Sequence, residues 1–189
     1  MQEKILLVIG SEKNKNGLLQ LLSASGLSCV TAVSDGEDAR VQMAQQEFNL
    51  VIINAPLPNE LGHELALGIA SNSLAGVIFM VKAEIAASVS NKISDKGIMV
   101  LSKPIQKAIF CQAVQLALAA NQKAARLQAE NEKLQDALAE LKLMNRAKCV
   151  LIQYLKMTEE QAHHYIEKQA MDLRCKKIQV AETILTMYE

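Results

Sequence analysis

The sequence predicts an α/β fold: a doubly wound, parallel five-stranded sheet, followed by a coiled-coil helix and a small three-helix domain. In the first hundred residues, short continuous apolar runs alternate with helical patterns, as is typical of parallel strands with helices on both faces. From about residue 110 to 154 the chain has neither proline nor glycine, which permits one long helix. Short amphipathic segments then continue towards the C-terminus.

The elements of the first domain follow one another in regular order. Residues 5–9 form an apolar run that ends at Gly10, and the next helical pattern stops at Gly26, which suits a C′ glycine. A strand over residues 28–33 precedes Asp35, which can cap the following helix. The remaining predicted elements are a strand at 50–53, a loop at 54–62, a helix at 65–69, a strand at 76–81, a helix at 85–93 and a strand at 98–101.

A ligand pocket is expected at the carboxyl ends of these strands, where open parallel sheets bind their ligands. The residues that would line it are Gly10, Ser11, Asn54, Lys82 and Lys103. The two lysines would repel each other in such a pocket. We therefore expect an acidic neighbour, Glu60 or Glu84, to offset their charge.

The long helix carries a narrow apolar stripe at alternating spacings of four and three residues, formed by Leu127, Asn131, Leu134, Leu138 and Leu141. This is the period of a coiled-coil seam. With leucines 127, 134 and 141 at d, the a positions are Ala117, Ala124, Asn131 and Leu138. A lone asparagine at a favours a parallel, in-register homodimer. The alternative is a long helix that packs on its own chain.

Three short helices are predicted after the seam, the first of them continuous with the long helix. Ala147 to Leu155 continue the long helix on a new apolar face. Thr158-Glu-Glu-Gln161 is a capping box that opens a second helix. Residues 172–175 make a bend, and Ile178 to Leu185 give the third helix.

Composition limits the classes of function. Lys and Arg number 20 against 20 Asp and Glu, but residues 142–189 hold eight against six, which permits nucleic-acid binding. Four separated cysteines (Cys29, Cys111, Cys149 and Cys175) indicate free thiols in a cytoplasmic protein. No stretch approaches the ~20 apolar residues of a membrane span. No nucleophile–base pair, phosphate loop or metal cluster indicates an enzyme, a metal site or a cofactor.

Five βα units, a proline-containing loop after the third strand and Ser102-Lys103-Pro104 after the fifth resemble the flavodoxin-like receiver domain of bacterial response regulators. The resemblance covers about residues 3–120 and places this domain at residues 1–120. Receivers hold Mg²⁺ with two acidic residues after the first strand, where this chain has Ile9-Gly10-Ser11. Their phosphoacceptor aspartate corresponds to Asn54, and their Ser or Thr after the fourth strand to Lys82; only Lys103 matches.

These departures predict a pseudo-receiver. Phosphoryl transfer to a side chain needs a carboxylate nucleophile, and Mg²⁺ is held by carboxylate oxygens. The amide of Asn54 supplies neither. We therefore expect no phosphorylation at position 54 and interpret this domain as one kept for packing and for contacts with partners.

Four segments behind the seam occur in a fixed order: Ala147-Lys148 with Leu151, Thr158 to Ala162, Ala170-Met171-Asp172, and Val180-Ala181-Glu182. In this order they resemble the ANTAR domain of the AmiR and NasR transcription antitermination regulators, over about residues 140–188. We place the coiled coil at 110–142 and the ANTAR domain at 142–189. The resemblance implies an RNA-binding dimer that binds paired stem-loops in leader transcripts and so prevents a terminator hairpin. Cys149 replaces a usual glycine and His164 a common basic residue.

The candidate RNA-binding residues are Arg146, Lys148, Gln153, His164, Lys168, Arg174, Lys176 and Lys177. Cations would contact phosphates, and Gln153 or His164 the base edges. The family motif specifies Lys148, whereas the alternative for each of the others is a solvated surface residue. Tyr154 and Tyr165 fall on the apolar helix faces, which predicts a place in the core. His163 and His164 are adjacent and point apart on a helix, so no metal site is expected.

The sequence is compatible with two main functions. The first is an antiterminator whose control comes from a partner such as a sensor or inhibitory protein, from a ligand, or from expression level. The second is a phosphorylation-independent interaction scaffold whose helical tail has lost RNA binding. The ordered ANTAR segments favour the first, and the mild charge excess of residues 142–189 favours the second.

Overall fold

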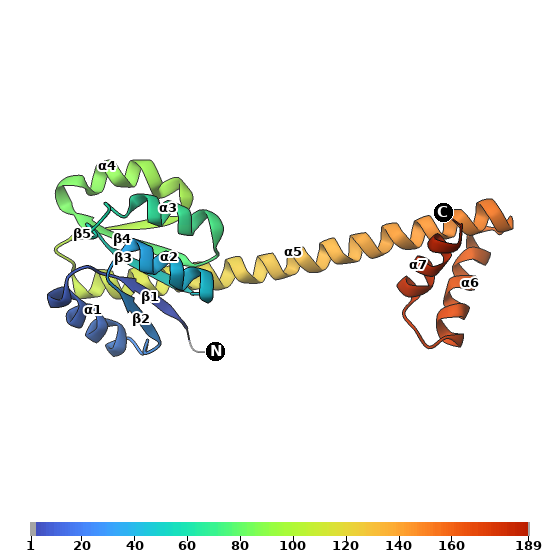
Figure 1. Cartoon of the computed structure of the whole chain (residues 1–189), viewed down its shortest axis with the longest axis horizontal. Coiled ribbons are helices and arrows are strands. Elements are labelled where there is room, and N and C mark those ends of the chain that lie inside the picture. The colour runs from blue at the N-terminus through green and yellow to red at the C-terminus, as the bar shows by residue number, and fades with distance from the viewer. Residues whose placement is uncertain (1–2, 189) are drawn as a thin grey trace. The chain divides into compact units, whose positions relative to one another are not determined.

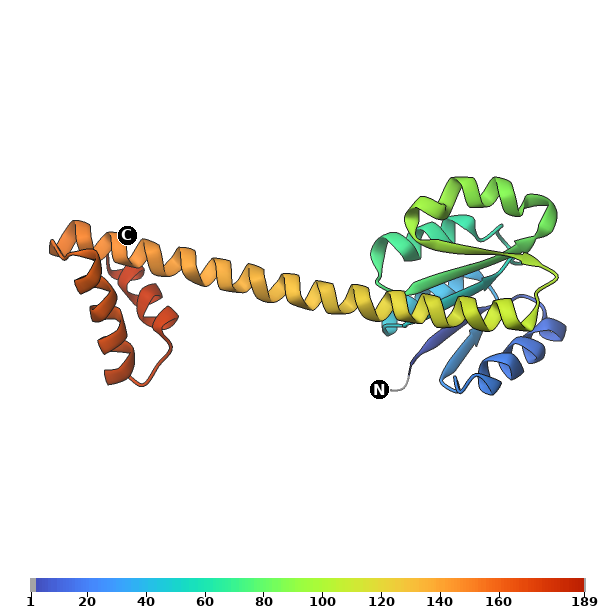
Figure 2. The ribbon, with the colours of Figure 1, turned by 180° about the vertical axis from the view of Figure 1, so that it is seen from behind.

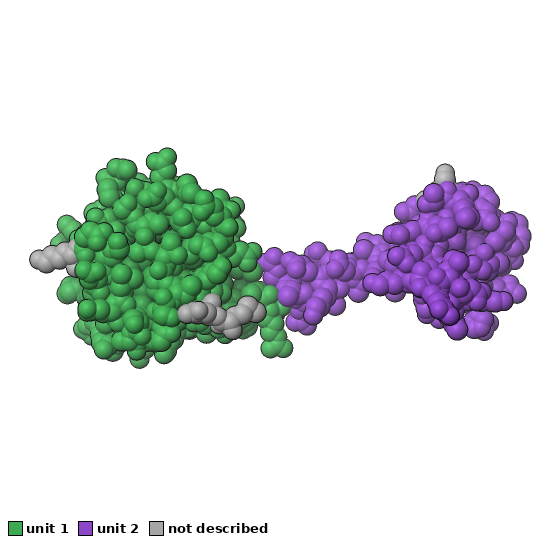
Figure 3. Space-filling view, turned by 60° about the horizontal axis from the view of Figure 1, so that its bottom comes forward, with its two compact units in different colours: residues 1–126 green, residues 127–189 purple. Residues whose placement is uncertain are grey.

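The computed structural model of the chain describes residues 3–188. It contains two compact units, residues 1–126 and residues 127–189 (Figure 3). One helix, α5 (Lys107–Leu155), contributes to both units. Among the described helices, none combines the length and the apolar character needed to cross a membrane.

The first unit is built on a five-stranded sheet in the order β2-β1-β3-β4-β5 (Figure 1). All neighbouring strands pair in parallel, as the continuous apolar runs predicted. The strands are β1 (Ile5–Val8), β2 (Val30–Val33), β3 (Leu50–Asn54), β4 (Gly76–Lys82) and β5 (Ile98–Lys103).

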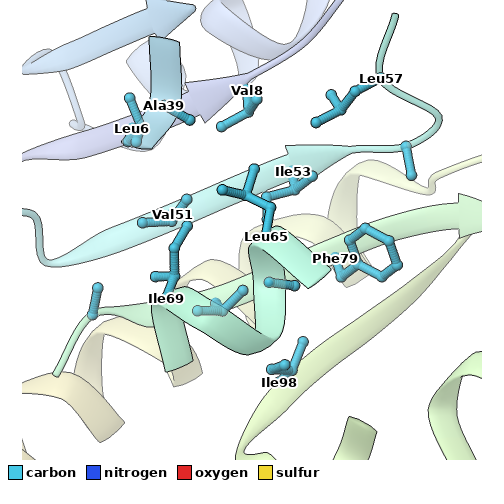
Figure 4. Close-up of a cluster of buried hydrophobic side chains, with 14 of the residues drawn as sticks. Leu6, Val8, Ala39, Val51, Ile53, Leu57, Leu65, Ile69, Phe79 and Ile98 are labelled. Atoms are coloured by element: carbon cyan, nitrogen blue, oxygen red, sulfur yellow. The ribbon is translucent and has the colours of Figure 1, made fainter. Parts of the chain in front are cut away.

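Helices cover both faces of this sheet. They are α1 (Glu12–Ala24), α2 (Gly36–Gln45), α3 (His63–Asn72), α4 (Ala83–Ile93) and the beginning of α5, with a 3₁₀ turn, η1, at Ser94–Lys96. Successive strand residues point to opposite faces. Leu6, Val51 and Phe79 pack towards α2, α3 and α4 (Figure 4). Helices α1 and α5 lie on the other face (Figure 2). They supply the buried Leu22 and Phe110. The doubly wound prediction is confirmed.

Local signals begin and end these helices. The Asp35 carboxylate accepts a 2.9 Å hydrogen bond from the backbone N–H of Asp38, as expected of an N-cap. After α1, Gly26 has a φ of +82°, as predicted for a C′ glycine. Helix α3 is longer than predicted, because it follows Gly62 directly at φ +83° and continues through polar residues to Asn72.

The beginning of α5 is anchored to the sheet by a close backbone approach and a buried amide. A Cβ on Gly76 would lie 2.8 Å from the carbonyl oxygen of Ala117. Asn121, only 6% exposed, donates to the Leu74 carbonyl at 2.7 Å and accepts from Asn49 at 3.3 Å. Ala117 is thus buried against the sheet, and its predicted place in the seam is wrong because the first unit uses this turn of the helix.

Further along α5, the leucine stripe is uncovered in the single chain. Leu127, Leu134, Leu138 and Leu141 are 56%, 65%, 52% and 59% exposed, and Asn131 is exposed as well. The alternative of a helix packed on its own chain is therefore wrong for this stretch. The seam as a dimer contact stays a prediction.

The second unit packs the end of α5 against α6 (Glu159–Asp172) and α7 (Lys177–Tyr188). Its core is made of small and aliphatic side chains, including the fully buried Ala147, Ala162 and Ile166. Both bonds of the predicted capping box form: Gln161 N–H to the Thr158 hydroxyl at 3.2 Å, and Thr158 N–H to the Gln161 side chain at 2.9 Å.

Candidate functional site

A cavity of about 400 Å³ opens at the carboxyl ends of the strands. It is lined by Gly10, Ser11, Asn14, Asn54, Ala55, Pro56, Leu57, Pro58 and Lys103. Four of the five residues predicted for this pocket are thus brought together. The fifth, Lys82, does not line the cavity; it is exposed at the end of β4. Asn14, one turn into α1, was missed, although its helical spacing from Ser11 could have indicated it.

Lys103 is the cation of this cavity. Its ammonium group donates to the backbone carbonyl of Ala55. Burial, and in second place the charge of Lys82, lower the pKa of Lys103 below its usual range. The predicted repulsion between the two lysines inside the pocket stays a prediction, since Lys82 lies outside the lining.

The predicted acidic neighbour is wrong. Glu60 forms its ion pair with Arg40 instead, at 2.9 Å, and this contact raises the pKa of Arg40. Among the described residues, Glu84 forms no ion pair with Lys82 or Lys103. The positive charge of the pocket is left uncompensated by a carboxylate.

Asn54 ends β3 and faces the cavity with 7% of its surface exposed. No carboxylate is among the lining residues. Magnesium prefers several carboxylate oxygens, so this donor set of amides, one hydroxyl and one ammonium does not fit the metal of ordinary receivers. Position 10 cannot supply the missing acid either, because a Cβ on Gly10 would lie 2.7 Å from Cδ of Pro58.

In the second unit, Lys148 differs from the other candidate RNA-binding residues. Its ammonium group lies 3.1 Å from a carboxylate oxygen of Glu159, and its side chain is only 18% exposed. Lys148 thus links α5 to the first turn of α6. The remaining candidates are exposed: Arg146, Gln153, His164, Lys168, Arg174, Lys176 and Lys177.

A second cluster gathers around Glu167 of α6. Lys177, the first residue of α7, pairs with its carboxylate, and His163 and His164 lie 3.4 and 3.7 Å from it. The hydrogen bond from Lys177 is the main reason that the pKa of Glu167 falls below its usual range. Two of the predicted RNA contacts, Lys177 and His164, therefore face an acidic residue of their own chain. In the part of the chain that the structure describes, no group of three potential metal ligands occurs.

One face of α5 brings two predicted residues together with residues that the sequence reasoning missed. Arg146 and Gln153 border a shallow cavity of about 510 Å³ with Lys142, Asn145, Cys149 and Val150. The positions are three to four residues apart, which is the spacing of one helix face. That spacing was available in the sequence and could have added Lys142 and Asn145 to the candidates.

The two tyrosines predicted to lie in the core are exposed instead. Tyr154 is 55% exposed and Tyr165 37%. The ring of Tyr154 lies beside that of Tyr188, with centroids 5.5 Å apart. The core of this small unit is filled by alanines and branched aliphatic residues, so the larger rings stay at its surface. Aromatic rings at a surface can stack on unpaired bases.

The receiver-like sheet and the three-helix tail together define a regulatory protein of the response-regulator class. Residues 132–185 match the ANTAR domain family. The transcriptional regulatory protein PdtaR of Mycobacterium tuberculosis is 31% identical over 170 residues, which cover 89% of this chain and 82% of that protein. The chain belongs to the ANTAR-domain response regulators.

Further similarities fall on each part separately. The nitrate regulatory protein of Klebsiella oxytoca is 44% identical over 54 residues, 29% of this chain and 14% of that protein. The solved receiver domain of an HD domain-containing protein from Pseudomonas fluorescens has a TM-score of 0.59 at 26% identity, covering 66% of this chain and 93% of that one. The receiver domain of a sensor histidine kinase from Pseudomonas aeruginosa has a TM-score of 0.54 at 20% identity, covering 63% and 99%. The receiver fold is confirmed.

Proposed function

We propose that the protein is an RNA-binding transcription antitermination regulator that acts as a parallel homodimer on paired stem-loops in leader transcripts. Membership of the ANTAR family supports RNA binding and antitermination. The observation that supports a dimer on paired stem-loops is the exposed leucine stripe of α5. The same helix carries Arg146 and Gln153 nearer its C-terminal end.

The dimer is supported by the exposure of the stripe. Four leucines, each more than half exposed, follow a heptad spacing within residues 127–141. Burying a leucine side chain stabilises an interface by about 1.5–3 kcal/mol, and these leucines gain that energy only against a second chain. Asn131 at an a position among leucines at d favours two parallel helices in register.

A parallel dimer would present two copies of the same RNA-binding surface, one for each stem-loop. Lys142 and Arg146, on one face of α5, supply cations for phosphates. Lys148 supplies a further cation where α5 meets α6. Gln153 supplies an amide for base edges, and Tyr165 an exposed ring for stacking. Lys168, Arg174 and Lys176 are further exposed cations in and after α6. Cations on a duplicated surface favour RNA through the sum of weak contacts.

The proposal includes independence from phosphorylation. Position 54 holds an amide, and the cavity around it has no carboxylate for Mg²⁺. Control then comes from a partner such as a sensor or inhibitory protein, or from expression level. The site of action is the cytoplasm, where leader transcripts are made.

A second candidate function, an interaction scaffold without RNA binding, is favoured by two contacts. Lys148 and Lys177 both pair with carboxylates of their own chain, Glu159 and Glu167. These pairs reduce the positive charge available to RNA. In each pair one partner is more than half exposed, Glu159 at 77% and Lys177 at 52%. Ion pairs that are open to solvent contribute little energy, so phosphates can compete for both lysines.

The test is a filter-binding titration of the full-length protein against a leader RNA with two adjacent stem-loops. A single-loop RNA and a scrambled RNA serve as controls, and sedimentation reports the oligomeric state. Saturable binding that needs both loops, from a dimer without any phosphodonor, is the expected result. A folded dimer that binds neither RNA would contradict antitermination and favour the scaffold. Equal binding of the two-loop and scrambled RNAs would contradict recognition of paired stem-loops.

A further inference from the structure

The pocket differs from that of ordinary receivers in its charge as well as in its missing carboxylate nucleophile. Its lining contains one ammonium group, that of Lys103, and no carboxylate. Lys103 forms no ion pair within the described residues, and its one hydrogen bond goes to a neutral carbonyl, that of Ala55. A partly buried cation without a counter-charge favours an anionic ligand.

Asn54 adds an unsatisfied polar group to the same cavity. Its residue surface is 7% exposed, and its side-chain amide makes no hydrogen bond to any residue that the structure describes. The amide lies against the cavity, where its N–H groups can donate to a ligand oxygen.

The N-terminus of α1 contributes from a third direction. Ser11 is the N-cap of this helix of 13 residues, and its hydroxyl makes no capping hydrogen bond. The first backbone N–H groups of a helix carry a partial positive charge, which favours bound anions. In α1 the N–H of Asn14 already donates to the Ser11 carbonyl at 3.1 Å, so an anion would meet the groups that precede it. Ser11 and Asn14 both line the cavity.

We propose that this pocket binds a small phosphate, either inorganic phosphate or the phosphate group of a small phosphomonoester. Lys103 supplies the charge, Asn54 and Ser11 supply hydrogen-bond donors, and the amides of α1 complete the anion site. The cavity of about 400 Å³ falls in the range of about 300–1,000 Å³ usual for small-molecule sites. Ala55, Pro56, Leu57 and Pro58 form its apolar wall, which leaves room for a short carbon skeleton.

The test uses the full-length protein in a buffer free of oxyanions. Inorganic phosphate, glycerol 2-phosphate and neutral glycerol are titrated separately while NMR follows the side-chain amide of Asn54, and calorimetry gives the dissociation constants. Saturable shifts with a phosphate, and none with glycerol, are expected. If glycerol 2-phosphate binds more tightly than inorganic phosphate, the apolar wall contacts the carbon skeleton of the ligand. If the two bind equally tightly, inorganic phosphate is the ligand of the pocket.

Three variants locate the site. Lys103→Met should weaken phosphate binding about tenfold or more. Asn54→Asp keeps the shape of the side chain but adds a negative charge, and should weaken binding at least as much. Lys92→Met removes an exposed lysine in α4, outside the pocket lining, and should leave the affinity within about twofold. The proposal is overturned by the absence of saturable shifts up to about 20 mM phosphate, or by an affinity unchanged in both pocket variants.

Discussion

The ammonium group of Lys148 lies 3.1 Å from the carboxylate of Glu159, across the junction between α5 and α6. Lys148 is the candidate RNA contact for which the sequence resemblance to the ANTAR domain gives the strongest reason, yet in the free protein it is engaged with its own chain. An RNA phosphate would have to replace Glu159 as its partner. Glu159 is 77% exposed at its side chain, so it can turn away into water when RNA binds.

This exchange predicts opposite effects for the two partners. Lys148→Ala should weaken RNA binding about tenfold and reduce the slope of affinity against salt by about one counterion. Glu159→Gln leaves Lys148 free and should bind RNA as tightly as the wild type or more tightly. Filter binding at several salt concentrations checks both. Equal losses in the two variants would mean that Lys148 acts only by holding α6 in place.

Arg146→Ala should also weaken RNA binding. If the guanidinium contacts a base, the loss of binding free energy should be about 1–3 kcal/mol. If it contacts a phosphate, the loss should be smaller, and the dependence of affinity on salt should become less steep. Lys92→Ala, a matched loss of positive charge in α4 of the first unit, is the control. Unchanged affinity and slope in Arg146→Ala would remove the α5 face from the RNA-binding surface.

The seam predicts that dimerisation depends on residues 127–141. Leu134→Ala and Leu138→Ala should each raise the dimer dissociation constant by at least about tenfold, since each is lost from both chains. Leu61→Ala removes a leucine that is 68% exposed in the first unit and should change nothing. Asn131→Leu should strengthen the association of the chains, but the variant should no longer form dimers in preference to larger oligomers. Sedimentation measures all four, and a leucine variant with wild-type association would contradict the seam.

Asn54→Asp should not turn the protein into a phosphorylated receiver. The substitution restores the nucleophile, but the cavity still lacks the two further carboxylates with which receivers hold Mg²⁺. Incubation with acetyl phosphate and Mg²⁺ should leave the mass of the variant unchanged in intact-protein mass spectrometry. A gain of one phosphoryl group at position 54 would show that Mg²⁺ can bind without the two missing acids.

The second unit should lose stability in acid through Glu167. The hydrogen bond from Lys177 holds the pKa of Glu167 below its usual range, so the ionised form favours folding. That stabilisation is present above the unfolded-state pKa and is lost as pH falls through the lower, folded-state pKa. Glu167→Gln should therefore show a flatter decline of Tm with acid than the wild type.

Tyrosine fluorescence measures this directly, because Tyr154, Tyr165 and Tyr188 are the only tyrosines of the sequence and all belong to the second unit. Glu182→Gln in α7 is a control, as Glu182 forms no ion pair within the described residues. Parallel acid curves for Glu167→Gln and the wild type would show that the Lys177 contact does not stabilise the unit.

Much of the fold was predictable because its signals are local. The apolar runs at 5–9 and 50–53 gave the buried strands, Asp35 and Thr158 gave helix starts, and Gly26 gave a helix end. The contacts that were missed join residues far apart in the chain. Ala117 was placed in the seam because a heptad count cannot show that Gly76 receives this turn of α5.

In the candidate site, too, the contacts that were missed join residues far apart in the chain. Lys148 and Glu159 are 11 residues apart and meet only after the chain turns between two helices. The exposure of Tyr154 and Tyr165 depends on how little volume the short helices enclose, which periodicity does not report. Glu60 was a reasonable partner for the pocket lysines by sequence position alone, but Arg40 of α2 is the residue it contacts.

The close approach of Pro58 to Gly10 limits which substitutions the pocket can accept. Any side chain at position 10 would collide with a proline ring, and such a ring cannot rotate away as a long side chain can. An acidic residue could return there only after Pro58 had been replaced, a change that gives no advantage by itself. Asp at position 54 likewise brings nothing without that acid. An acidic pair with Asp at position 54 and a carboxylate at position 10 therefore requires three substitutions together, at positions 10, 54 and 58, because the Pro58 ring occupies the space of a side chain at position 10.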